Sequence, residues 1–203
     1  MSTLTKQRAI TIWAALTAVL WTTYSGLRLT IGGQCPNPDL QENFDRERYL
    51  GRWYEMFRHY DVPYEYGDCA TATYSERTFN RFEIDNVEYL LDEDKWARDD
   101  DFPLGKGIVS NWRSGLANVK FFELAPWAKY MVLATDYDNY SVVYNCDNFA
   151  GGMVKVEYLW ILTRVPEAIG STAWNTMRDT VWAIVDSKVG DRITPATDLR
   201  PTE

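Results

Sequence analysis

Eight short runs of aromatic and β-branched residues stand between residues 52 and 164, and they constrain the fold more than any other feature of the chain. Turn-forming segments such as 61–68 (DVPYEYGD) and 147–152 (DNFAGG) separate them. Residues of these types favour strands, and short strands at this spacing are typical of an antiparallel barrel or sandwich. The expected strands cover residues 52–60, 69–77, 81–91, 105–113, 118–124, 130–136, 139–145 and 156–164.

The period of the apolar residues changes to that of a helix after residue 164. A helix over 166–189 is predicted, because Pro166 opens the segment and Gly190 follows it. Residues 191–199 predict one last short edge strand. The expected apolar face of the helix comprises Ile169, Ala173, Met177, Val181, Ile184 and Val185.

These elements predict an all-β protein, an eight-stranded antiparallel up-and-down β-barrel with one C-terminal amphipathic α-helix packed outside. The interior of such a barrel is just wide enough for one small ligand.

The N-terminal segment, residues 1–33, has two interpretations. Residues 9–27 carry no charge and follow Lys6 and Arg8, as in a secretory signal that is cleaved near Ser25 or Gly33. About 20 apolar residues also suffice for a retained membrane anchor. In both cases residues 34–203 form one domain on the extracytoplasmic side, either secreted or lumenal, or tethered to the membrane by residues 9–27.

Charge and cysteine content narrow the partners and the compartment. The net charge of −8 argues against nucleic acid, whose phosphates would be repelled, and otherwise indicates solubility. The 3 cysteines fit one disulfide and one odd thiol in an oxidising compartment.

Three segments resemble the signature segments of the lipocalin family, in the same order and at similar spacing. They are 50–55 (LGRWYE), 133–146 (LATDYDNYSVVYNC) and 159–164 (LWILTR). Segment 35–55 (CPNPDLQENFDRERYLGRWYE) is most similar to the apolipoprotein D and bilin-binding branch of that family. The resemblance covers residues 35–199.

The resemblance implies a scaffold at the closed end of the barrel. Gly51 would let the chain turn into the first strand, and Trp53 would plug this end. Arg164 would lie over the Trp53 indole as a cation–π pair. The hairpin loop at the same end would hold Thr135, Asp136 and Tyr137. The family disulfide corresponds to Cys35 and Cys146.

The resemblance also implies a ligand-binding calyx lined by Tyr74, Asn86, Tyr130 and Trp160. Two phenols and an indole would form apolar walls with polar tips, and the amide would bind a polar group of the ligand. The alternative is that these side chains simply fill a core without a ligand, as in small barrels.

The main functional hypothesis is binding and transport or sequestration of a small hydrophobic ligand. Candidates are a sterol or steroid, a fatty acid, a retinoid or carotenoid, or a bilin; no cofactor is required, although a bilin, carotenoid or lipid could be bound. An alternative is a membrane-anchored barrel that serves as a structural or docking subunit.

A third hypothesis is a thiol enzyme that uses Cys69, because the C-terminal tail lacks the cysteine that pairs with this one in related proteins. Without that partner, Cys69 is either a thiol outside any disulfide or is bonded to another chain or a ligand. His59, the only histidine, is expected at the solvated barrel rim, and nothing ties it to Cys69. No catalytic residue and no metal site are therefore assigned. Asn139 opens a glycosylation sequon in the expected hairpin turn.

Overall fold

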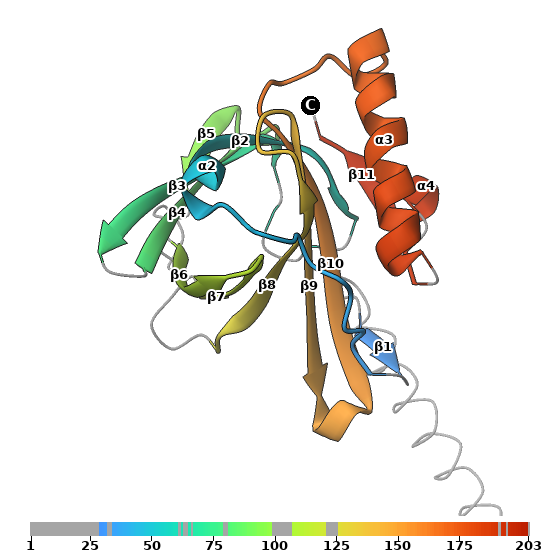
Figure 1. Cartoon of the computed structure of the whole chain (residues 1–203). Coiled ribbons are helices and arrows are strands. Elements are labelled where there is room, and N and C mark those ends of the chain that lie inside the picture. The colour runs from blue at the N-terminus through green and yellow to red at the C-terminus, as the bar shows by residue number, and fades with distance from the viewer. Residues whose placement is uncertain are drawn as a thin grey trace, which may run out of the picture.

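Eight antiparallel strands close into the predicted barrel in the computed structural model, in which each strand pairs with the next and β10 pairs back with β2 (Figure 1). The barrel strands are β2 (Gly51–His59), β3 (Asp68–Thr78), β4 (Arg81–Leu90), β6 (Gly107–Arg113), β7 (Leu116–Lys120), β8 (Ala128–Thr135), β9 (Tyr140–Phe149) and β10 (Val154–Thr163). The structure describes residues 29–31, 34–60, 62, 65, 67–78, 81–98, 107–120, 126–190, 192–193 and 195–202.

The alternation of strand direction defines the two ends of the barrel. The connections β2–β3, β4–β6, β7–β8 and β9–β10 lie at one end, which we call the mouth. The connections β3–β4, β6–β7 and β8–β9 lie at the other end, which we call the closed end. The chain enters β2 at the closed end, directly after helix α2 (Arg46–Tyr49).

The described part of the chain also contains three further strands and three short helical turns. β5 (Lys95–Arg98) pairs with β4, and β11 (Leu199–Pro201) pairs with β2 as the last edge strand, after helix α4 (Pro195–Asp198). β1 (Leu29–Ile31) pairs with β10 and lies inside the segment 1–33 that the sequence assigns to a signal or anchor. The 3₁₀ turn η2 (Ala150–Gly152) joins β9 to β10. The uncharged stretch 9–27 lies outside the described residues, and none of the described helices is long and apolar enough to cross a membrane.

Helix α3 (Thr172–Val189) lies against the outside of the barrel (Figure 1). It begins at Thr172 and not at Pro166, because Gly170 has a φ of +81° and Ser171 caps the helix by accepting the Trp174 N–H at 3.1 Å. The predicted apolar face was therefore partly wrong: Ile169 and Ala173 are exposed. The buried face comprises Trp174, Val181, Val185 and Val189, with Met177 and Ile184 partly buried.

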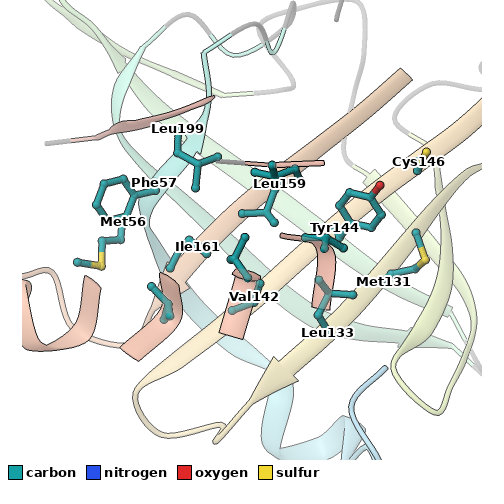
Figure 2. Packing of buried hydrophobic residues seen from close by; sticks show 14 of the residues in the cluster. Met56, Phe57, Met131, Leu133, Val142, Tyr144, Cys146, Leu159, Ile161 and Leu199 are labelled. Atoms are coloured by element: carbon teal, nitrogen blue, oxygen red, sulfur yellow. The ribbon is translucent and has the colours of Figure 1, made fainter. Parts of the chain in front are cut away.

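The core has an outer and an inner part. The outer part fills the space between the barrel wall and α3, where Phe57 and Ile161 lie (Figure 2). The ring of Trp174 packs 5.2 Å from that of Phe57. The inner part fills the closed end of the barrel with aromatic rings, among them Trp53 and Trp112. A disulfide joins Cys35 of the N-terminal arm to Cys146 of β9.

A β-bulge in β2 changes which side chains point into the barrel. Glu55 pairs with Leu162 and Phe57 with Ile161, so Met56 is an extra residue without a partner in the register. Because a bulge breaks the strict alternation of faces, Glu55 and Arg58 share the inner face although they are three residues apart. Met56 and Phe57 both join the outer core.

The expectation that His59 is solvated at the barrel rim was wrong. His59 is fully buried, because the C-terminal strand β11 covers the end of β2 and pairs Leu199 with His59. The imidazole Nδ1 accepts the backbone N–H of Leu159 at 2.8 Å. This contact holds the imidazole ring against β10.

Candidate ligand-binding cavity

The closed end of the barrel is sealed by Trp53 and Arg164. Trp53 is fully buried, and its indole N–H donates to the carbonyl oxygen of Tyr49 at 2.9 Å. The guanidinium of Arg164 lies 3.7 Å from the centre of the Trp53 ring. Its nitrogens donate to the carbonyl oxygens of Arg48, Tyr49, Leu50, Arg52 and Tyr137 at 2.7–3.2 Å. One side chain therefore ties α2, the start of β2 and the β8–β9 turn together.

Gly51 stands where the turn into β2 requires it. Its φ of +96° is a conformation that L-residues with a Cβ rarely adopt. A Cβ at this position would lie 3.4 Å from Arg164 Nη1, which is van der Waals contact and not a clash. The backbone conformation, and not the approach of the guanidinium, is therefore the reason for glycine here.

The β8–β9 turn at the closed end contains Asp136 and Tyr137 and follows Thr135. The Thr135 hydroxyl donates to the carbonyl of Tyr140 at 2.6 Å and accepts the Tyr137 N–H at 2.9 Å. The Tyr137 phenol lies beneath the guanidinium of Arg48, 4.6 Å from it, and accepts the Asp45 N–H at 2.8 Å. Hydrogen bonds from the backbone and the Asn139 side chain lower the pKa of Asp136.

A cavity of about 300 Å³ occupies the rest of the barrel interior. The four predicted residues Tyr74, Asn86, Tyr130 and Trp160 all line it, from strands β3, β4, β8 and β10. Glu65 of the β2–β3 connection and Pro126 of the β7–β8 connection also line it, which places one side of the cavity at the mouth. Only closure of the barrel brings these six residues together.

A row of hydroxyls crosses the floor of the cavity. The Tyr130 phenol lies 2.5 Å from that of Tyr74 and 3.1 Å from that of Tyr49, which lies 2.8 Å from the Ser141 hydroxyl. Burial raises the pKa of Tyr49 to about 12 and the pKa values of Tyr74 and Tyr130 well above 10. All three phenols therefore stay neutral and can both donate and accept hydrogen bonds.

One side of the cavity carries buried acidic groups, which we call the acidic wall: Glu55, Glu65 and Glu88. Glu55 Oε1 lies 2.9 Å from Arg58 Nη1, and Glu65 Oε2 lies 3.9 Å from the same nitrogen. Glu65 Oε2 also accepts the indole N–H of Trp160 at 2.8 Å. The guanidinium of Arg58, which is 1% exposed, thus pairs with both Glu55 and Glu65.

Burial raises the pKa values of two of these carboxyl groups. The pKa of Glu55 rises to about 7, mainly by burial and against the attraction of Arg58. The pKa of Glu65 rises to about 8 by burial and by the nearby charge of Glu55. Both groups can therefore hold a proton near neutral pH, in contrast to carboxyl groups in water.

Gly67 connects the third member of the wall to Arg58. Its N–H donates to Glu88 Oε2 at 2.9 Å, and its carbonyl accepts hydrogen bonds from Arg58 and, at 3.2 Å, from Arg200. A Cβ on residue 67 would lie 2.5 Å from the carbonyl oxygen of Tyr89, so only glycine fits against β4 here.

The sequence interpretation missed the acidic wall and Tyr49. The period-two pattern of β2 gave no sign of the bulge that turns Glu55 and Arg58 inward together. Residue 65 was counted as part of a polar turn. The available signal was a pair of opposite charges three residues apart within the apolar run 52–60 (RWYEMFRHY).

Comparison with known proteins agrees with this architecture. A family model described as a lipocalin-like domain matches residues 44–185. Apolipoprotein D of Cavia porcellus is 44% identical over 133 residues, which are 65% of this chain and 67% of that protein. Apolipoprotein D of Mus musculus is 38% identical over 156 residues, which are 76% of this chain and 78% of that protein. The chain belongs to the lipocalin family.

Solved structures show the same fold at lower sequence identity. Insecticyanin from the tobacco hornworm Manduca sexta superposes with a TM-score of 0.65 at 20% identity, covering 88% of this lipocalin and 89% of that chain. Apocrustacyanin C1 superposes with a TM-score of 0.63 at 18% identity, covering 86% and 89%.

Cys69 of this lipocalin lies at the start of β3 and is exposed, with a φ of +52°. It takes no part in the disulfide and does not line the cavity. A ligand in the cavity would therefore not face this thiol, and the thiol-enzyme hypothesis gains no support from its position.

Asn139 is exposed in the β8–β9 turn, but its amide nitrogen is already engaged. The Nδ2 atom donates to Asp136 Oδ2 at 2.7 Å. A glycan would replace only one of the two hydrogens on this nitrogen and would leave the other to donate to Asp136. Glycosylation of Asn139 stays a prediction.

Proposed function

We propose that this lipocalin binds a small hydrophobic molecule in the barrel cavity and carries or sequesters it on the extracytoplasmic side. The observation that supports this most is the convergence of Tyr74, Asn86, Tyr130 and Trp160 on one cavity. The disulfide and the sequence identity with apolipoprotein D support a location in an oxidising compartment.

The wall of the cavity suits a ligand that is mostly apolar and has few polar groups. The rings of Tyr74, Tyr130 and Trp160 offer flat apolar contacts, and the phenols at the floor can bind an oxygen of the ligand. Asn86 is half-buried on β4 and adds an amide to the same interior. Such a site binds by apolar burial and a few hydrogen bonds, without chemistry.

The cavity volume favours the smaller candidate ligands over the larger ones. About 300 Å³ is at the lower limit of ligand pockets, which span roughly 300–1,000 Å³. A single acyl chain, a steroid or a retinoid is therefore favoured over a bilin or a carotenoid. Binding of the larger molecules would require the connections at the mouth to move.

Titration of sterols, fatty acids, retinoids and bilins against tryptophan fluorescence tests this function. A bound ligand should change the emission, and Trp160→Phe should remove most of that change. Trp96→Phe is the matched control, because Trp96 is 58% exposed and does not line the cavity. If no ligand binds more tightly than about 100 μM, which corresponds to about −5.5 kcal/mol, the carrier function is rejected and the docking-subunit hypothesis takes its place.

A further inference from the structure

Two carboxyl groups of the cavity share one buried cation when the acidic wall is ionised. Glu55 and Glu65 line the cavity, and the buried guanidinium of Arg58 contacts both. Buried charges are stable only when they are paired, so an unbalanced wall requires either protons or another cation.

One carboxylate oxygen of this wall has no hydrogen-bond donor among the described residues. Glu55 is 6% exposed at the side chain and interacts with Arg58 and with the Thr202 side chain. Glu65 is 20% exposed and accepts the Trp160 N–H with one oxygen, whereas its other oxygen accepts no hydrogen bond within the described part of the chain, although the side chain lines the cavity. A largely buried acceptor that faces a cavity without a partner is a position for a donor on a ligand.

The described contacts of the basic side chains that also line the cavity are with groups other than Glu55 and Glu65. Arg98 of β5 is 56% exposed and pairs with Asp85 at 3.1 Å. Lys120 of β7 is half-buried and lies 5.2 Å from the centre of the Trp127 ring, and Lys129 of β8 is exposed. Water screens Arg98 and Lys129, whereas the interior screens the wall weakly.

The remaining polar groups near the wall are neutral or already paired. Arg200 of β11 approaches from behind Gly67 and pairs with Asp68 at 2.8 Å. The phenol of Tyr74 faces Glu65 across the cavity and remains protonated, because its pKa is raised well above 10 by burial and by neighbouring groups including Glu65. Without a ligand, the wall is therefore balanced mainly by protons on Glu55 and Glu65, whose pKa values are raised to about 7 and about 8.

We infer that the ligand of this lipocalin is an apolar molecule with a cationic nitrogen, which Glu55 and Glu65 recognise at the acidic wall. The inference rests on the proposed function, because it assigns a head group to the molecule that the cavity binds. An ammonium group would replace the protons on the wall, while the apolar part of the ligand would lie against Tyr74, Tyr130 and Trp160. A fatty-acid anion would meet like charge and would bind only to the protonated wall.

Three probes with the same decyl chain separate the contribution of the head group from that of the chain. They are decyltrimethylammonium, decan-1-ol and decanoate, each titrated calorimetrically into the full protein at pH 6.0, 7.0 and 8.5. The quaternary nitrogen does not titrate, so any change in its affinity with pH belongs to the protein. Circular dichroism at each endpoint shows that the protein remains folded, and only saturable binding of one molecule per chain counts.

The expected affinities differ in rank and in pH dependence. At pH 8.5 the cation should bind at least tenfold more tightly than the alcohol, and the anion more weakly than both. Cation affinity should rise about tenfold or more from pH 6.0 to 8.5, because Glu55 and Glu65 ionise over this range. The alcohol should change less than twofold, and decanoate affinity should fall.

Two variants assign the effect to the wall. Glu65→Gln keeps an oxygen for the Trp160 N–H but removes the charge, so it should reduce cation affinity at pH 8.5 at least fivefold and leave decan-1-ol unchanged. Glu55→Gln should act in the same direction. Glu76→Gln is the matched control, because Glu76 is exposed on β3 and does not line the cavity.

The outcomes separate this inference from the proposed function. Equal affinity for the three probes at pH 8.5, or tightest binding of decanoate, overturns the cationic ligand and leaves the carrier function standing. A cation preference that survives both Glu→Gln changes also overturns it. If no decyl probe and no molecule of the hydrophobic panel binds, the carrier function itself fails.

Discussion

The closed end of the barrel and the acidic wall of the cavity both hold charge partly or fully away from water, but they treat it in opposite ways. At the closed end, the half-buried guanidinium of Arg164 donates to five carbonyl oxygens and stacks on Trp53. At the wall, two carboxyl groups, Glu55 and Glu65, share the one buried guanidinium of Arg58. The charge at the closed end has a full set of partners within the protein, whereas the two carboxyl groups need a proton or a ligand in addition to Arg58.

This difference separates stability from function within one barrel. A buried charge with all its partners costs little and orders the elements it joins, whereas one without a full set of partners destabilises the fold. A protein keeps such groups where they act on another molecule. We therefore expect changes at the closed end to reduce stability, and changes at the wall to raise it while altering binding.

The largest effect is expected from Trp53→Ala at the closed end. The fully buried indole would leave a void among the packed rings of Tyr49 and its neighbours, so the free energy of unfolding should fall by about 3–5 kcal/mol. Urea denaturation measures this loss. Trp96→Ala, at a 58% exposed indole, should change stability by less than about 0.5 kcal/mol. A loss below about 1 kcal/mol for Trp53→Ala would contradict its role as a plug.

Arg164→Ala should have the next largest effect, about 2–4 kcal/mol. The change removes the cation over Trp53 and the donors for several carbonyl groups of α2 and β2, but it leaves the plug itself in place. Arg164→Lys should recover only a small part of this loss, since an ammonium cannot reach the same set of carbonyls. Full recovery by lysine would show that charge alone matters here and not the planar fork.

The sequence predicts the residues of the closed end better than those of the acidic wall. Gly51, Trp53 and Arg164 stand in short segments that resemble a family signature, so the closed end could be predicted residue by residue. The four aromatic and amide residues of the cavity were predicted in the same way, and the structure places all of them on one cavity. The acidic wall could not be predicted, because it depends on the bulge at Met56, and a period-two pattern places Glu55 and Phe57 on the same face.

Other errors have the same physical origin, which is tertiary structure that local patterns do not contain. His59 was expected in solvent, but a strand from the far end of the chain covers it. The helix was expected from Pro166, but a positive φ at Gly170 and the cap at Ser171 delay its start. Trp174 was missed as an anchor of the helix because its partner, Phe57, lies on a distant strand.

Glu65→Gln should stabilise the protein, by an amount that grows as the pH rises from about 4.5 to 8. The pKa of Glu65 is raised from 4.5 to about 8, so the folded state holds a proton that the unfolded chain releases between these values. Stability from this group is present below about pH 4.5 and is lost as the pH rises through about 8. At pH 8.5 the variant should gain on the order of 1–3 kcal/mol over the native protein, since one pKa unit corresponds to about 1.4 kcal/mol.

Thermal unfolding of both proteins at pH 4.0 and 8.5 measures this gain. At pH 4.0 the two should be nearly equal, because Glu65 is then mostly protonated in both the folded and the unfolded state and glutamine is its neutral isostere. Glu76→Gln should show no such pH dependence. A variant that is less stable than the native protein at pH 8.5 would mean that the wall is paired internally, as the closed end is.

The smallest effect is expected on the cavity floor, where the two regions meet. Tyr49 bonds to both Tyr130 and Ser141 and is fully buried, so Tyr49→Phe leaves two buried hydroxyls short of a partner and should cost about 1–2 kcal/mol. The Tyr74 hydroxyl is at the end of the row and bonds to the Tyr130 hydroxyl, so Tyr74→Phe should cost about 0.5–1 kcal/mol.

Ligand binding should rank the two Tyr→Phe variants in the opposite order to stability, with the larger loss of affinity for Tyr74→Phe. Tyr74 lines the cavity and Tyr49 does not, so only Tyr74→Phe removes a hydroxyl that a bound molecule can reach. Urea denaturation measures the stability of both variants. Titration with two ligands of the panel, one with an oxygen atom and one without, measures their binding. Tyr74→Phe should weaken the former by about 1 kcal/mol and spare the latter. Equal weakening by both variants would mean that the row acts as one structural unit, and the floor would then belong with the closed end.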